Sequence, residues 1–296
     1  MAPARTSQTA ALTLIFFLSG ASGLVFEIVW FRGLALTFGS ATPAIATVVA
    51  AFMAGLALGN LALGPMADRS PAPLRLYQRL EVGIGLTGLL VSLLLVKGEV
   101  VLAPLTRIVA GAGAVGGPLR FILVFGLMTV PTALMGGTLP VMARALHRSG
   151  AAGRVLGWLY AVNTGGAVIG ALLPDLLTVP RIGLAATALV AALGNLLAAL
   201  AVRAVAVDAP PVRSLPRRAL SRPALALYAA SGFCALGYQI VWGRLLAMWS
   251  LSWVVSYSVL LAVFLACLAV GSHLGSRVAD RVRDPLVWAA LLLVAT

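Results

Sequence analysis

The sequence predicts an all-α transmembrane protein, a polytopic helical bundle that crosses the bilayer several times. Three observations lead to this fold class. Of the 296 residues, 61% are hydrophobic and 10% are charged, whereas a water-soluble domain has roughly 50% apolar and about 25% charged residues. The mean hydropathy is +1.05. The apolar residues form runs of about 20, long enough in helical form to cross a bilayer, and backbone groups in lipid must be bonded within their own segment.

Eight such runs follow one another along the chain. They cover residues 10–33, 42–64, 76–96, 119–142, 154–174, 183–203, 223–248 and 253–275. A ninth run begins at Pro285 and stops at Thr296, and its roughly 18 Å of helix is too short to cross. We therefore expect a fragment whose sequence ends inside a helix. The first run could be taken for a signal peptide, but a related segment recurs at residue 231, so we expect an uncleaved first span.

The placement of arginine and lysine predicts the orientation, because cytoplasmic loops carry the excess of these residues. Fifteen of the 21 lie at the N-terminus or after the even-numbered spans. The six on the opposite side are Arg32, Lys97, Arg107, Arg120, Arg181 and Arg244. We expect a multi-pass protein of a bacterial-type inner membrane with its N-terminus in the cytoplasm. The net charge of +13 then reflects topology and contact with the lipid bilayer. It does not indicate nucleic-acid binding, which needs a basic face with aromatic platforms.

One segment of the sequence occurs twice. Residues 19–36 read SGASGLVFEIVWFRGLAL, and residues 231–248 read SGFCALGYQIVWGRLLAM. An offset of 212 aligns the two copies without a gap, and roughly a third of the positions are identical. Rare residue types coincide in this alignment, and Glu27 is replaced by Gln239. The identical pairs of rare residues are Trp30 and Trp242, Arg32 and Arg244, Asp68 and Asp280, and Arg69 and Arg281.

The repeat divides the chain into a first half of six spans at 1–203, a basic Pro/Arg-rich cytoplasmic linker at 204–222, and the start of a second half at 223–296. An even number of spans gives both copies the same orientation, as in the parallel halves of major facilitator transporters. GPMADR at 64–69 resembles the core of the facilitator loop signature. The second copy, SRVADR at 276–281, lacks the glycine, and neither copy has the basic tail of the signature. We expect a major facilitator-like bundle with a truncated second half.

Four stretches resemble a narrower family. They are SGASGLVFEIVWFRGLALTFGS, AAFMAGLALGNLALGPMADR, PTALMGGTLPVMARAL and YAVNTGGAVIGALLPDLL. Together they are similar to the membrane region of fused proteins in which a facilitator-like domain precedes a spermidine synthase-like domain. The resemblance implies a connection to polyamine aminopropyl transfer and a fused or associated aminopropyltransferase-like partner.

The enzyme of that family is not recognisable in this sequence. MGGT at 135–138 is the only string similar to its Gly-rich cofactor loop, and it lies within a span without an acidic neighbour. We therefore expect no catalytic residue, cofactor or metal site in this chain. The resemblance favours a membrane domain that anchors the enzyme or handles a polyamine substrate or product. The alternative is a stand-alone major facilitator-like secondary transporter of a small solute, with a cation as one option.

Three residues are candidates for contact with a cation or another substrate. Glu27 lies inside the first span, where an ionised carboxylate is costly unless it faces a cavity or a partner. It is either a cation site or a polar clamp between helices, and Gln239 at the repeated position favours the clamp because an amide carries no charge. Asn163 lies beside Gly165 and Gly166, where helices approach closely. We expect it to serve packing, with substrate contact as the alternative.

Two further sets of residues have a predicted role at the membrane surface. Tryptophan and arginine at the ends of spans are typical of interface anchors, and the sequence offers Trp30, Arg32, Trp242 and Arg244. Cross-helix pairing of Arg32 remains open. An Asp-Arg pair at a helix-to-loop junction is either a conformational latch between the halves or a solvated local ion pair. The latch candidates are Asp68, Arg69, Asp280 and Arg281. Glu81 and Asp175 are expected near opposite interfaces, close enough for hydration.

Overall fold

The computed structural model describes residues 2–38, 41–97, 116–146, 152–205, 222–250 and 253–279. These residues are almost entirely helical, with no strand among them. The elements are α1 (Ala2–Phe38), α2 (Ala41–Arg69), α3 (Pro73–Val96), α6 (Gly116–Ala145), α7 (Ala152–Leu173), the π-helical turn η2 (Pro174–Thr178), α8 (Val179–Arg203), α9 (Arg222–Ser250) and α10 (Trp253–Ala279).

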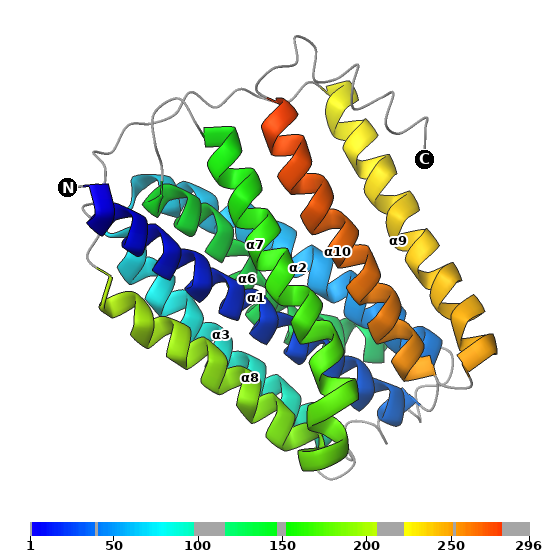
Figure 1. Ribbon diagram of the computed structural model, residues 1–296. Helices are drawn as coiled ribbons and strands as arrows, with labels where there is room; N and C mark the ends of the chain where they lie inside the picture. Colours follow the sequence, from blue (N-terminus) through cyan, green and yellow to red (C-terminus); the bar gives the residue numbers. More distant parts are fainter. Residues whose placement is uncertain are drawn as a thin grey trace.

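Seven helical stretches in the described residues are long and apolar enough to cross a membrane. Therefore the chain is a multi-pass helical bundle. One of the seven, Arg154–Arg203, has 50 residues, far more than the roughly 20 that a single crossing needs. The chain turns within it at η2 and at Gly183, whose φ of 77° is not helical. Figure 1 shows α7 and α8 leaving this turn in different directions, so this stretch accounts for two of the eight spans that hydropathy predicts.

The first six crossings pack as neighbouring pairs (Figure 1). The closest pairs are α2 with α6, α1 with α7, and α3 with α8, and α3 also contacts α6 while α1 also contacts α8. The remaining two helices extend one side of this six-helix unit. Helix α10 packs on α7, and α9 packs on α10.

Glycines allow the closest of these approaches. A Cβ atom on Gly166 or Gly170 of α7 would lie about 2 Å from the carbonyl oxygen of Phe17 or Ala21 in α1. Helices α2 and α6 meet in the same way, because a Cβ atom on Gly59 would overlap the backbone of Ala133. Small residues four positions apart are typical of membrane helices whose backbones touch. The sequence therefore specifies the α1–α7 and α2–α6 contacts through glycine spacing.

Large side chains of α1 fill the centre of the bundle. Phe26, Trp30 and Phe31 are fully buried in the main apolar cluster, which also takes side chains from α2, α3, α7, α8 and α10. A second apolar cluster lies nearer the N-terminal end of α1 and includes Phe16 and Tyr77. Helix α9 differs from the other helices, because most of its residues are exposed. The six-helix unit therefore holds most of the described core, with α1 at its centre.

Candidate functional site

Polar side chains connect α10 to the six-helix unit near the C-terminal end of α1. We call this group the interhelical polar cluster; it consists of Glu27 and Arg32 in α1, Asp175 in η2, and Tyr257 and Ser258 in α10. Glu27, Asp175, Tyr257 and Ser258 are buried. Polar and ionisable groups inside a membrane protein are expensive to bury and mark functional contacts more often than not.

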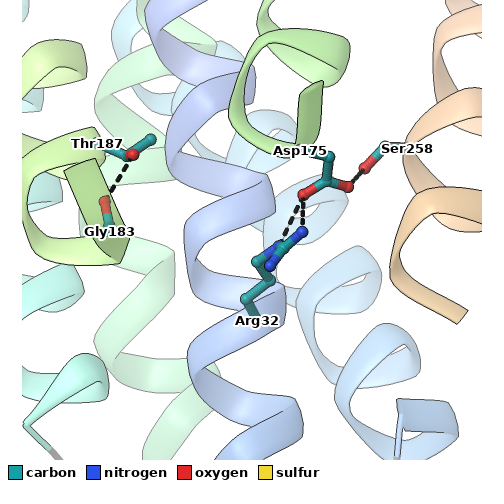
Figure 2. A network of polar contacts seen from close by, with 5 residues as sticks. All are labelled: Arg32, Asp175, Gly183, Thr187 and Ser258. Atoms are coloured by element: carbon teal, nitrogen blue, oxygen red, sulfur yellow. Dashed lines mark hydrogen bonds and ion pairs between the residues drawn. The ribbon is translucent and has the colours of Figure 1, made fainter. Parts of the chain in front are cut away.

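An ion pair forms the centre of the interhelical polar cluster. Arg32 approaches Asp175 with two nitrogen atoms, Nη2 at 2.5 Å and Nε at 2.7 Å from Oδ1. The other carboxylate oxygen of Asp175 accepts a hydrogen bond from Ser258. Figure 2 shows these three side chains converging from α1, η2 and α10. The Asp175 side chain is 1% exposed and that of Arg32 is 23% exposed, so the carboxylate depends on its protein partners while the guanidinium group retains some access to the surroundings.

Pro174 and Gly183 shape the turn that carries Asp175 and the start of the helix that follows it. Pro174 begins η2, and Gly183 lets the chain reverse with a positive φ that a glycine adopts without strain. The Thr187 hydroxyl group then donates to the Gly183 carbonyl oxygen at 2.8 Å, as drawn in Figure 2. The π-helical turn, the glycine and the threonine together place Asp175 between α1 and α10.

Glu27 makes a direct polar contact between α1 and α10, in addition to the link through Asp175. The Tyr257 hydroxyl group donates to Glu27 Oε1 at 3.0 Å. Among the described residues, no arginine, lysine or histidine forms an ion pair with Glu27. The contact is of the kind that the clamp interpretation predicts, and it leaves the carboxyl group without a cationic partner on the described part of the chain.

Trp30 and Arg32 do not have the environment that we predicted. Trp30 is fully buried, its Nε1 donates to Ser92 Oγ at 2.9 Å, and its ring stacks on Phe26 with 5.7 Å between centroids. It is a core residue that joins α1 to α3, so the prediction of an interface anchor was wrong for Trp30. Arg32 is engaged by Asp175 across 143 residues, which is the cross-helix pairing that the sequence left open.

The other anchor candidates lie on α9. Trp242 is 54% exposed and Arg244 is exposed as well. These positions leave both side chains free to reach lipid, and their role as anchors stays a prediction. Gln239 is buried on the same helix.

Asn163 lies where α7 and α1 touch. Its Nδ2 donates to the Phe16 carbonyl oxygen at 3.0 Å, which joins α7 to α1. A Cβ atom on Gly20 would overlap the backbone of Asn163, so the helices touch at this point. The contact is of the kind that a packing role predicts, and substrate contact by Asn163 stays a prediction.

Only the first of the two predicted latch pairs lies within the described residues. Asp68 and Arg69 are exposed at the C-terminal end of α2. Asp68 lines a shallow hollow between α2 and α6, together with Asn60 and Pro140. Asp280 and Arg281 lie outside the described residues, so the latch between the two halves stays a prediction.

A second group of polar residues lies inside the six-helix unit. We call it the core polar cluster, and it consists of Ser19 in α1, Tyr77 and Glu81 in α3, and Asn195 in α8, all of them buried. Ser19 Oγ donates to Glu81 Oε1 at 2.5 Å, and Asn195 Nδ2 donates to Oε2 at 2.8 Å. The expected hydration of Glu81 at an interface was therefore wrong, and the expected hydration of Asp175 was wrong for the same reason.

Sequence reasoning missed Tyr257, Ser258, Ser19 and Tyr77. Hydroxyl groups are common in membrane helices, so their presence in an apolar run gives no signal by itself. The signal that was available is the set of buried acids, because Glu27, Glu81 and Asp175 each require partners. The sequence could not say which hydroxyl or amide group supplies them.

The described residues contain no group of three or more histidine, cysteine, aspartate or glutamate side chains that could hold a metal ion. Comparisons with protein-family models, with curated proteins and with solved structures found no match to this chain. The site is therefore interpreted from its own geometry.

Proposed function

We propose that this chain is a transporter-like membrane domain in which the interhelical polar cluster holds α10 against the six-helix unit and opens when the two parts move. The observation that carries the proposal is the set of buried contacts from Tyr257 and Ser258 to Glu27 and Asp175. Ionisable groups that face one another across helices inside a membrane mark solute or ion paths in many such proteins.

The helix pairing supports a transporter-like arrangement. The contacts among the first six helices are symmetric between α1, α2, α3 and α6, α7, α8. If these two sets are exchanged in order, the α1–α7 contact becomes the α6–α2 contact. The same exchange turns α3–α6 into α8–α1 and leaves α3–α8 unchanged, and all of these pairs are in contact. Such a pattern is expected of two three-helix units with inverted topology, which are nested within each half of facilitator transporters. The pairs α1–α2 and α9–α10, which carry the sequence repeat, are also each in contact.

The charges at the cluster favour a cationic solute. Asp175 is neutralised by Arg32, but Glu27 has no ion-pair partner among the described residues. If α10 moves away, the Glu27 carboxylate is exposed at the parting surface. An amine is a suitable occupant, and the resemblance to the membrane region of spermidine synthase-like fusion proteins makes a polyamine the first solute to test. Anchoring or supplying an aminopropyltransferase-like partner is the corresponding cellular role.

A second candidate function is stand-alone transport of another small cation. It rests on the same opening of the cluster but needs no enzyme partner. The two functions differ in substrate range: the first requires spermidine or its precursor diamine to be carried, and the second is met by any small cation that competes at Glu27. Residence in an inner membrane with the N-terminus in the cytoplasm belongs to both proposals.

Cross-linking across the cluster tests the proposed movement. Cysteines replacing Glu27 and Arg32 are unsuitable, because both residues belong to the site. The background protein has Cys234 and Cys267 replaced by alanine. In it, a cysteine at the exposed Val255 or Val259 of α10 is paired with a cysteine at the exposed Leu177 of η2. Short bifunctional thiol reagents then join the two cysteines of each pair. Labelled spermidine uptake is then measured in proteoliposomes.

We expect a cross-link between α10 and η2 to abolish uptake, and single-cysteine variants treated with the same reagent to retain it. A reducible reagent should restore uptake when it is cleaved. Full uptake by the cross-linked protein would overturn the proposed opening. Uptake no greater than that of protein-free vesicles, for spermidine and for other small cations alike, would overturn transport itself.

A further inference from the structure

The carboxyl group of Glu81 is fully enclosed by the six-helix unit. Glu81 is 0% exposed. It lies on the part of α3 that faces α1 and α8. It belongs to the core polar cluster and takes no part in the contacts with α10. The interhelical polar cluster therefore does not explain why an acid is buried here.

The partners of Glu81 are neutral. Ser19 of α1 donates to one carboxyl oxygen at 2.5 Å and Asn195 of α8 donates to the other at 2.8 Å. Among the described residues, no arginine, lysine or histidine forms an ion pair with Glu81. Helix α6, the remaining neighbour of α3, contributes the apolar side chains of Val141 and Met142 to the surrounding cluster.

A negative charge in this position would be uncompensated. Moving an ionised carboxylate into an apolar interior without a cation costs several kcal/mol or more, and such groups normally take up a proton instead. Two hydrogen bonds from neutral donors reduce that cost but leave the charge in place. The environment of Glu81 thus favours the neutral acid.

Two buried oxygen atoms beside Glu81 lack a hydrogen-bond partner, although the Tyr77 hydroxyl group can either donate or accept. Tyr77 Oη and Asn195 Oδ1 are buried without a hydrogen-bond partner among the described residues. Tyr77 precedes Glu81 by four residues, so both side chains project from one face of α3. A carboxyl group that carries a proton can donate it to an acceptor, whereas a carboxylate cannot. Rotation of the Asn195 side-chain amide would likewise present its oxygen to the same group.

We propose that Glu81 is a proton-binding site inside the six-helix unit, with Ser19 and Asn195 as donors to its carboxyl group and Tyr77 as the acceptor of its proton. Tyr77 is the titratable group that faces Glu81, and α1 and α8 present serine and asparagine. Helix α6 contributes the apolar Val141 and Met142 and, on the same stretch, the charged Arg144. Loss of the proton would require Tyr77 to turn from acceptor to donor and Ser19 to bind a charged oxygen. Both changes alter the contact of α3 with α1.

This site is mechanically connected to the interhelical polar cluster through α1. Ser19 and Glu27 lie on that one helix, eight residues or about 12 Å apart. A change in the proton at Glu81 therefore acts on the helix that carries Glu27 and Arg32. This last link rests on the proposed function, whereas the binding of the proton does not.

Infrared spectroscopy of the whole chain in lipid nanodiscs tests the site directly. A protonated carboxyl group has a carbonyl stretch that is separate from the bands of a carboxylate. We expect the wild-type protein near neutral pH to show such a band that is lost in Glu81→Gln and retained in Asp68→Asn, whose carboxyl group is exposed. Ser19→Ala keeps the acid but removes a donor, so the band should remain and shift.

Stability gives a second measurement. Glutamine resembles a protonated carboxyl group, with one acceptor and one donor, so Glu81→Gln should melt within a few degrees of the wild type at neutral pH. The absence of a Glu81-dependent carbonyl band at neutral pH would overturn the proposal. A band that appears only when sodium is replaced by choline would also overturn it, because sodium would then occupy the site. Lack of spermidine uptake, with the band present, would overturn the proposed function and leave the proton site intact.

Discussion

The Tyr257 hydroxyl group donates to the Glu27 carboxyl group across 230 residues of sequence. This hydrogen bond joins the first helix of the chain to the second helix of the repeated segment. Both residues are buried, and the Tyr257 ring also packs against Phe31 of α1 with 4.8 Å between the ring centroids. The contact gives the buried acid a hydrogen-bond partner in the membrane core.

Substitutions at Glu27 distinguish its charge from its hydrogen bond. Glu27→Gln keeps an oxygen for the Tyr257 hydroxyl group and nearly the same volume, so we expect little change in the free energy of unfolding. Glu27→Leu leaves that hydroxyl group buried without a partner, which should cost about 1–3 kcal/mol. The measurement is denaturant or thermal unfolding in detergent, with Tyr257→Phe added to Glu27→Leu as the control that removes the stranded group.

The same variants report on polyamine binding. If Glu27 compensates the charge of a bound amine, Glu27→Gln should lose about 2–5 kcal/mol of binding energy, a thirtyfold or greater weakening. Titration calorimetry with spermidine measures this directly. Normal spermidine binding by Glu27→Gln would eliminate the cation-site interpretation and leave the clamp.

The Arg32–Asp175 ion pair gives a larger expected effect. Arg32→Ala leaves the Asp175 carboxylate buried without its cation, and the loss of one partner of a buried pair costs about 3–5 kcal/mol. The double variant Arg32→Ala with Asp175→Asn should recover part of that loss because the uncompensated charge is gone. Unfolding of the two single variants and the double variant completes the cycle.

The repeat supplies a matched control for this ion pair. Arg244 aligns with Arg32 in the repeated sequence but is exposed on α9. Arg244→Ala should therefore leave the unfolding free energy nearly unchanged. Equal losses for Arg32→Ala and Arg244→Ala would show that the ion pair with Asp175 is not what stabilises the fold.

Hydropathy predicted the helices well, because an apolar run of about 20 residues indicates a membrane crossing and a crossing of that length is helical. It placed α3 at 76–96 against Pro73–Val96 in the structure. The environment of each polar residue could not be predicted, because it depends on which face of a helix meets a neighbour. Trp30 lies at the end of a span, as an anchor would, but its face is covered by α3 and α2.

The pairing of Arg32 with Asp175 had a partial signal. Both residues were expected near the same side of the membrane, so the sequence allowed a contact between them. The turn that brings them together depends on the π-helical geometry at Pro174 and the positive φ of Gly183. The periodicity of apolar residues in the sequence reveals neither a π-helical turn nor a glycine with positive φ.

Two glycines should respond differently to the same substitution by alanine. A Cβ atom on Gly170 would lie 2.1 Å from the Ala21 carbonyl oxygen, whereas one on Gly126 of α6 would meet nothing within 4 Å. Gly170→Ala should therefore force α7 away from α1 and destabilise the protein by about 1–3 kcal/mol. Gly126→Ala should be neutral or stabilising by up to about 1 kcal/mol, because alanine favours the helix. Melting temperatures of the two variants provide the comparison, and a loss at Gly126 equal to that at Gly170 would contradict the close α1–α7 contact.

The orientation of the chain can be tested by thiol labelling in intact cells. Replacing Cys234 and Cys267, which are both exposed on their helices, by alanine gives a background without native thiols. A single cysteine at Lys97, the residue that follows α3, should react with a membrane-impermeant maleimide because the arginine and lysine distribution places it outside the cytoplasm. A single cysteine at Ser214 in the 204–222 linker should react only after the membrane is permeabilised. Labelling of Ser214→Cys but not of Lys97→Cys in intact cells would reverse the predicted orientation, and with it the side of the membrane on which Arg32 and Asp175 meet.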